Sequence, residues 1–124
     1  MTAYYPEQVP VDGYGAGGFT FARMSHRGSI LALPSGIHGW AIDPLKVMID
    51  DFAPVLAERE KIDILLIGTG LEMLRLPKPV REALAQTGLM ADTMATGHAV
   101  STYNLLFAEK RRVAAALIAV DHGA

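Results

Sequence analysis

An apolar run that ends in a glycine turn constrains the fold more than any other feature of this sequence. Residues 63–70 read DILLIGTG, and apart from Asp63 the strand positions are apolar one after another. A strand with one solvent-exposed face would alternate apolar and polar residues, whereas a parallel strand covered by helices is apolar on both faces. We therefore interpret residues 62–67 as a buried parallel strand, which indicates an α/β fold.

The sequence around this strand predicts a β-α-β-α-β order over the last two thirds of the chain. Pro79 suits a first helical turn and Gly88 a helix end, and Thr96 could cap the next helix. The expected helices cover residues 51–60, 79–87 and 96–110, and the expected strands cover 62–67, 89–94 and about 111–120. The last segment is alanine-rich and would also suit a helix, but it lacks a polar face. Right-handed crossovers would make these three strands parallel neighbours in one sheet.

The first third of the chain is β-rich. The glycine-dense stretch DGYGAGG (12–18) is expected to be a loop between two short strands, and residues 28–34 and 37–42 form two more. Their short connections favour antiparallel pairing. The prediction is a compact, three-layer single domain over residues 1–124, around a mixed, mainly parallel sheet with an extra N-terminal β layer. Only residues 1–10 are expected to be disordered.

Composition excludes several classes of function. The chain has 124 residues and a formal charge of −2, so no excess of positive charge would draw it to nucleic acid. It has no cysteine, which fits a reducing compartment. The N-terminus does not resemble a signal peptide, and no apolar stretch approaches the roughly 20 residues of a membrane span. We expect a cytoplasmic protein without a transmembrane segment.

The GTG turn does not match a nucleotide-binding loop. The dinucleotide fingerprint needs a third glycine and a helix that starts at once, whereas Met73 and two prolines follow here. A tight turn, in which glycine lets backbone approach backbone, is the favoured interpretation.

The turn could still contribute to a pocket by its position. Parallel strands 62–67 and 89–94 would end at one edge of the sheet, where ligands gather in open α/β folds. The helix that begins near Thr96 would direct free N–H groups at the same space. The candidate residues of this anion pocket are Gly68, Thr69, Gly70, Thr96, Gly97, His98, Thr102 and Asn104.

No catalytic constellation is visible beside this pocket. A histidine base needs an orienting carboxylate, and the sequence spacing of Asp92 or Glu72 to His98 does not predict a contact with its imidazole. No histidine pair has the i, i+4 spacing of a metal site. We assign no catalytic residue, metal or cofactor, and a non-enzymatic role is favoured.

Three segments together resemble a known family. They are VDGYGAGGFTFARMSHRGSILALPSGIHGW, DILLIGTG and ATGHAVSTYNLLFAEKRRVAAALI, spanning about Val11 to Ile118. The set resembles the uncharacterised-protein family that includes the mitochondrial complex I assembly factor 3 and the adipogenesis-associated domain proteins. The resemblance implies a three-layer α/β domain, no established activity in bacterial members, and a setting near protein-export genes. Relatives often have an acid at Ala95 and a cysteine at Val100, so no catalytic role carries over.

Two hypotheses follow for the function. The first is a non-enzymatic assembly factor related to respiratory complex I biogenesis. It would bind a membrane-complex subunit or the export machinery, peripherally to the inner membrane, through an apolar patch of Tyr4, Tyr5 and the GAGGF loop. The alternative is a small anionic-ligand-binding protein or enzyme that uses the pocket between loops 68–70 and 95–104.

Overall fold

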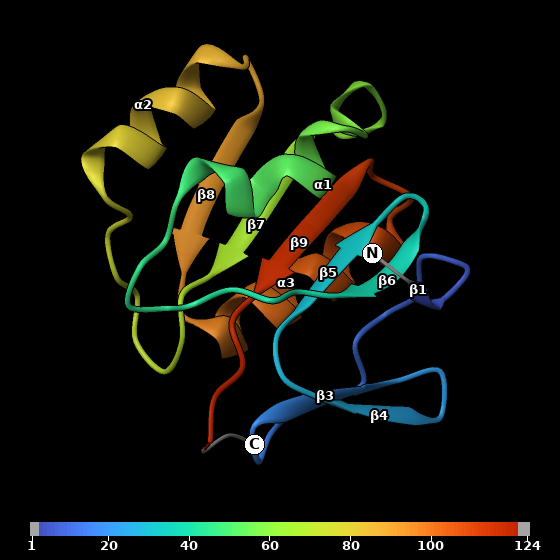
Figure 1. The fold of residues 1–124 in the computed structure, drawn as a ribbon. Coiled ribbons are helices and arrows are strands. Elements are labelled where there is room, and N and C mark those ends of the chain that lie inside the picture. Colours follow the sequence, from blue (N-terminus) through green and yellow to red (C-terminus); the bar gives the residue numbers. More distant parts are fainter. Residues whose placement is uncertain (1–2, 122–124) are drawn as a thin grey trace.

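The computed structural model describes residues 3–121, in which nine strands form two sheets (Figure 1). The strands are β1 Ala3–Tyr5, β2 Gly13–Gly15, β3 Gly18–Phe21, β4 Met24–Arg27, β5 Ile30–Leu33, β6 Gly36–Gly39, β7 Ile64–Gly68, β8 Met90–Met94 and β9 Val113–Leu117. The helices are α1 Ala53–Leu56, α2 Lys78–Gln86 and α3 Thr96–Ala108, with 3-10 turns η1 Ile49–Phe52 and η2 Arg59–Lys61.

The main sheet has six strands in the order β1-β6-β5-β9-β7-β8. Strands β9, β7 and β8 are parallel, which confirms the predicted β-α-β-α-β unit, and the α/β class and mixed sheet are confirmed with it. The pairings β1–β6, β6–β5 and β5–β9 are antiparallel, so the expectation of a mainly parallel sheet is wrong. The physical reason is that the β5–β6 hairpin pairs with β9 and extends the main sheet instead of forming a separate layer.

The extra N-terminal layer is the antiparallel sheet β2-β3-β4. The glycine stretch expected to be a loop is mostly strand, because Gly13–Gly15 pairs with Gly18–Thr20 across a turn at Ala16 and Gly17. Within residues 1–10, for which disorder was expected, β1 (Ala3–Tyr5) pairs with β6; residues 1–2 lie outside the described part.

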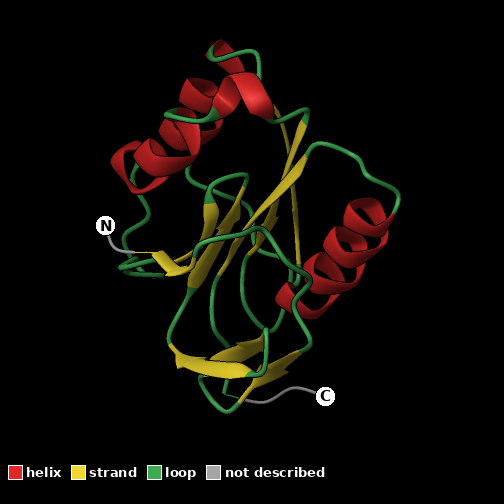
Figure 2. Cartoon of the chain, turned by 90° about the vertical axis from the view of Figure 1, so that its right-hand side faces the viewer, coloured by secondary structure: helices red, strands yellow, loops and turns green. Residues whose placement is uncertain are grey.

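The main sheet has a hydrophobic core on each face. Leu65 and Ile67 of β7 pack with Leu84 of α2 on one face, while Leu66 packs with Tyr103 of α3 on the other. Since successive side chains of a strand point to opposite faces, this arrangement explains why β7 is apolar throughout. Figure 2 shows α3 on one side of the sheet, α1 and α2 on the other, and the small sheet at one end.

The helix expected over residues 51–60 is broken into short pieces. Asp51 does not cap it; its carboxylate instead accepts a hydrogen bond from the Met48 N–H at 2.7 Å, within the 3-10 turn η1. Only Ala53–Leu56 is α-helical before the chain enters η2.

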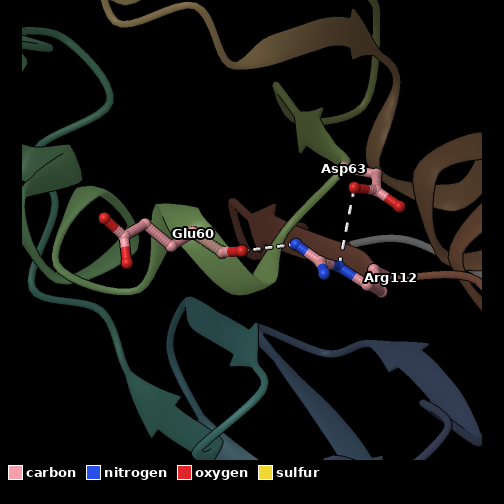
Figure 3. A network of polar contacts seen from close by, with 3 residues as sticks. All are labelled: Glu60, Asp63 and Arg112. Carbon is pink, nitrogen blue, oxygen red and sulfur yellow. Dashed lines mark hydrogen bonds and ion pairs between the residues drawn. The ribbon is translucent and has the colours of Figure 1, made fainter.

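The basic run before β9 helps to fix where that strand begins (Figure 3). The Arg112 guanidinium lies 3.5 Å from the Asp63 carboxylate and donates to the Glu60 carbonyl, while the Asp63 N–H donates to the Arg112 carbonyl at 2.7 Å. Both charged side chains are more than half exposed, so water weakens their attraction and the ion pair adds little stability.

Across residues 3–121, we find no helix with the length and apolar character that crossing a membrane requires.

Candidate functional site

The two glycine turns of the predicted pocket lie side by side, as the parallel order predicted. The Thr96 N–H donates to the Gly70 carbonyl at 2.8 Å, and the Thr96 hydroxyl accepts from the Gly70 N–H at 3.0 Å. The same hydroxyl donates to the Ile118 carbonyl at 2.7 Å. Thr96 is fully buried, so its hydroxyl joins the ends of β7, β9 and α3 instead of facing a ligand.

Thr96 is therefore not the helix cap that the sequence suggested. It is the first residue of α3, Ala95 occupies the N-cap position, and the Ala95 side chain makes no capping hydrogen bond. The cap role would require the hydroxyl to accept from an N–H group in the first turn of its own helix, whereas this hydroxyl is bonded to Gly70 and Ile118.

Both glycines of the GTG turn are required by geometry, which confirms the structural interpretation. A Cβ on Gly68 would lie 2.9 Å from the Thr96 Cα, closer than two non-bonded carbon atoms approach in folded proteins. Gly70 has φ +116°, a conformation that residues with a side chain rarely adopt. The GTG motif is thus a tight corner packed against the start of α3.

Thr69 organises the loop that leaves this corner. Its hydroxyl lies 2.9 Å from the Glu72 carbonyl and accepts from the Leu74 N–H at 2.8 Å, and the residue is only 6% exposed. The side-chain hydroxyl that could have bound an anion is again bonded to the protein's own backbone.

The first turn of α3 is covered on one side by the small sheet. A Cβ on Gly97 would lie 2.3 Å from the hydroxyl oxygen of Tyr14 in β2, so that ring rests directly against the helix start. His98 is exposed beside it. The helix N-terminus therefore meets a tyrosine of the same chain at the place where the sequence predicted space for an anion.

The remaining two predicted residues lie further along α3. Asn104 binds the backbone of Val11 in both directions, accepting from its N–H at 2.9 Å and donating to its carbonyl at 2.7 Å. Thr102 is half-buried on the same helix. The structure thus brings together Gly68, Thr69, Gly70 and Thr96, and assigns Asn104 to holding the N-terminal segment.

Sequence reasoning missed a cluster of Ser35, His38 and Glu58. The Ser35 hydroxyl lies 2.7 Å from His38 Nε2 and donates to the Glu58 carboxylate at 2.6 Å. In a catalytic triad the carboxylate would orient the imidazole, but here it takes the serine's only proton. Burial lowers the pKa of His38 more than the neighbouring Glu58 charge raises it. The cluster connects the β5–β6 turn to the chain after α1. The spacing of Ser35 and His38 is a local sequence signal, but no local pattern predicts their contact with Glu58.

Four exposed apolar side chains lie on the loop after β7 and on β8. Leu71, Met73 and Leu74, on the loop after β7, are 66%, 58% and 59% exposed, and Met90 at the start of β8 is 66% exposed. The Thr93 hydroxyl lies 3.9 Å from the Met73 sulfur, which brings this loop against β8.

The apolar patch expected at the N-terminus is only partly present. Tyr4 is 45% exposed, but Tyr5 is half-buried and Phe19 of the GAGGF segment is 2% exposed. Phe19 is turned inward because it lies on the face of β3 that packs toward the sheet and α3.

Comparison with known proteins shows the family. Residues 11–118 match the family described as "Protein of unknown function (DUF498/DUF598)", and this chain belongs to it. An uncharacterised protein of Rhodobacter capsulatus is 41% identical over 110 residues, covering 89% of this chain and 84% of that protein.

The chain is also similar to a mouse assembly factor and to a protein of known structure. Mouse NADH dehydrogenase [ubiquinone] 1 alpha subcomplex assembly factor 3 is 30% identical over 119 residues; the match covers 95% of this chain but only 64% of the mouse protein. A crystal structure from Bartonella henselae, described as an outer membrane protein, is 50% identical with a TM-score of 0.89, covering 94% of this chain and 99% of that one. The family resemblance is therefore confirmed, while the cytoplasmic location stays a prediction.

Proposed function

We propose that this protein is a non-catalytic, protein-binding assembly factor that acts in the biogenesis of a membrane respiratory complex. The observation that carries the proposal is the 30% identity to a complex I assembly factor along 95% of this chain. Because that relative is longer, its role is transferred here as a proposal for the shared part. A cytoplasmic location, peripheral to the inner membrane, belongs to the same proposal.

The geometry of the glycine turns supports a binding role over a catalytic one. The hydroxyls of Thr69 and Thr96 and the amide of Asn104 are bonded within the fold, and His98 is exposed with no carboxylate bonded to it among the described residues. A reaction or a tight anion site needs polar groups that converge on a shared space. The alternative, an anionic-ligand site between loops 68–70 and 95–104, gains no such support.

The exposed side chains after β7 and on β8 also favour a protein partner. Methionine and leucine exposed to this degree on neighbouring segments cost solvation free energy in the free protein, and a partner surface would relieve it. The partner in this proposal is a subunit of the membrane complex or of the protein-export machinery.

The test is chemical cross-linking in cells of the organism that carries the gene. A tagged copy is cross-linked, the membranes are solubilised, and the captured proteins are identified by mass spectrometry against cells with an untagged copy. We expect enrichment of subunits of one respiratory complex or of the export machinery. Recovery of a tightly bound small anion in place of any such subunit would contradict the proposal.

A further inference from the structure

Strand β8 is an edge of the main sheet that lacks a partner on its outer side. Within residues 3–121 it pairs only with β7, and it ends the strand order. Met90, Ala91 and Asp92 are exposed. Unpaired edge strands attract other strands, so proteins usually protect them.

The backbone N–H and C=O groups of β8 that face away from β7 belong to alternate residues. The Met94 carbonyl accepts from the Thr69 N–H at 2.9 Å, so Met94 directs its polar groups toward the β7 side. Because this direction alternates along a strand, Asp92 does the same, while Ala91 and Thr93 direct their N–H and C=O groups outward. The edge therefore offers two donors and two acceptors in register with an incoming strand.

The side chains of β8 also alternate between the two faces. Asp92 is the register partner of Leu66, whose side chain lies on the α3 face. Thr93 is the partner of Ile67, on the α2 face. The Asp92 side chain is thus placed on the α3 face, opposite to the side chains of Ala91 and Thr93.

On the α2 face a groove runs beside the edge. It has a volume of about 390 Å³, and its lining includes Leu76, Leu84 and Leu89 together with Ala91 and Thr93. Side chains of an added strand that stand opposite Ala91 and Thr93 would point to this groove, whose lining is mostly apolar but includes Arg81, bonded through Nε to the Leu76 carbonyl at 3.0 Å.

Pairing of two copies through this edge is opposed by Asp92. The antiparallel register that uses all the outward groups joins Ala91 of each copy to Thr93 of the other. That register sets Asp92 against Asp92 at a non-hydrogen-bonded position, where Cα atoms are about 4.5 Å apart and like charges destabilise. Asp92 makes no ion pair with any residue in the described part of the chain. It would instead favour a strand with a positive residue at that position.

We propose that the β8 edge binds an extended segment of the partner protein in the pattern apolar–basic–apolar. The basic residue faces Asp92 on the α3 face, and the two apolar residues face the groove beside α2. The added strand runs antiparallel to β8 and completes hydrogen bonds with Ala91 and Thr93. This inference rests on the proposed function, because it names the surface and the kind of segment that the partner supplies.

The test uses synthetic nonapeptides with the core Val-Xaa-Val flanked by threonines, where the central residue is Lys, Ala or Asp. Binding is followed by NMR titration and amide hydrogen exchange. Two further Lys peptides carry N-methyl groups, one at both valines and one at the lysine. In this antiparallel register the two valines direct their N–H groups at β8 and the lysine directs its N–H group away, so the first modification should abolish binding and the second should be tolerated.

We expect the Lys peptide to bind about fivefold more tightly than the Asp peptide. This preference should reverse in Asp92→Lys and persist in the control Glu109→Lys, an equal charge change at an exposed position after α3. The amides of Ala91 and Thr93 should be protected from exchange in the complex. Equal affinity for all peptides, shifts that map elsewhere, or a wild-type dimer that pairs through β8 would overturn the proposal.

Cross-linking in cells separates this proposal from the assembly-factor role. Loss of the captured subunit in Asp92→Lys but not in Glu109→Lys supports the edge as the docking surface. Capture that is indifferent to Asp92→Lys overturns the edge proposal while the assembly role stands. Peptide binding at the edge with no respiratory or export subunit captured from cells overturns the assembly role alone.

Discussion

Replacing Thr96 by valine tests whether the hydrogen bonds of its buried hydroxyl, at the candidate pocket, stabilise the fold. Valine has nearly the same shape and is also β-branched, so the change removes the hydroxyl and little else. Two hydrogen bonds are lost, one from the Gly70 N–H and one to the carbonyl of Ile118, a residue only 7% exposed. At about 1 kcal/mol each, with an added cost for a buried carbonyl left unpaired, we expect a loss of about 2–3 kcal/mol in the free energy of unfolding.

The assay is urea unfolding followed by circular dichroism, with a thermal melt beside it. An unfolding entropy of about 2.1 cal/mol/K per residue over 124 residues gives about 0.26 kcal/mol/K, so the Tm should fall by about 8–12 °C. Thr102→Val, at a half-buried position on the same helix, is the matched control and should change stability by about 0.5 kcal/mol or less. Equal losses of stability in the two variants would refute the structural role of the Thr96 hydroxyl.

Three further predictions concern single positions. Gly68→Ala should lower the free energy of unfolding by about 2 kcal/mol or more in urea titrations, because its Cβ would lie 2.9 Å from the Thr96 Cα; wild-type stability would refute this contact. Burial lowers the folded-state pKa of His38, so neutral His38 stabilises the fold above the unfolded pKa of about 6.5, and this stabilisation is lost as the pH falls through the folded pKa. The free energy of unfolding should therefore be lower at pH 5 than at pH 7.5, by a smaller difference in His38→Gln than in the wild type. An equal difference in both proteins would contradict this prediction. His98→Ala should leave partner capture unchanged. In calorimetric titrations with phosphate, neither the wild type nor the variant should show tight, pH-dependent binding; such binding in the wild type and its loss in the variant would contradict the prediction.

The sequence predicted the parallel half of the fold because its signals are local. Pro79 lies in the first turn of α2, and Gly88 follows the helix with φ +78°, so each matches the backbone that its position requires. The continuous apolar character of β7 correctly indicated helices on both faces. The adjacency of the two glycine turns followed from strand direction alone.

Other features depend on contacts between distant segments, which no local pattern reveals. The β5–β6 hairpin joins β9 of the main sheet, a pairing of residues more than 80 positions apart. Asn104 holds Val11 across 93 residues, and Ser35 meets Glu58 across 23. A threonine at a strand end could equally bind a ligand or the protein itself, and only the burial of Thr96 decides between them.

The assembly role is tested most directly by deleting the gene in its own organism. NADH–quinone oxidoreductase activity in isolated membranes is measured together with the amount of fully assembled complex on native gels, and a plasmid copy of the wild-type gene is the control. The account predicts that deletion reduces assembled complex and activity in parallel, and that the plasmid restores both. Unchanged assembly and activity in the deletion strain would contradict a role in the biogenesis of this complex.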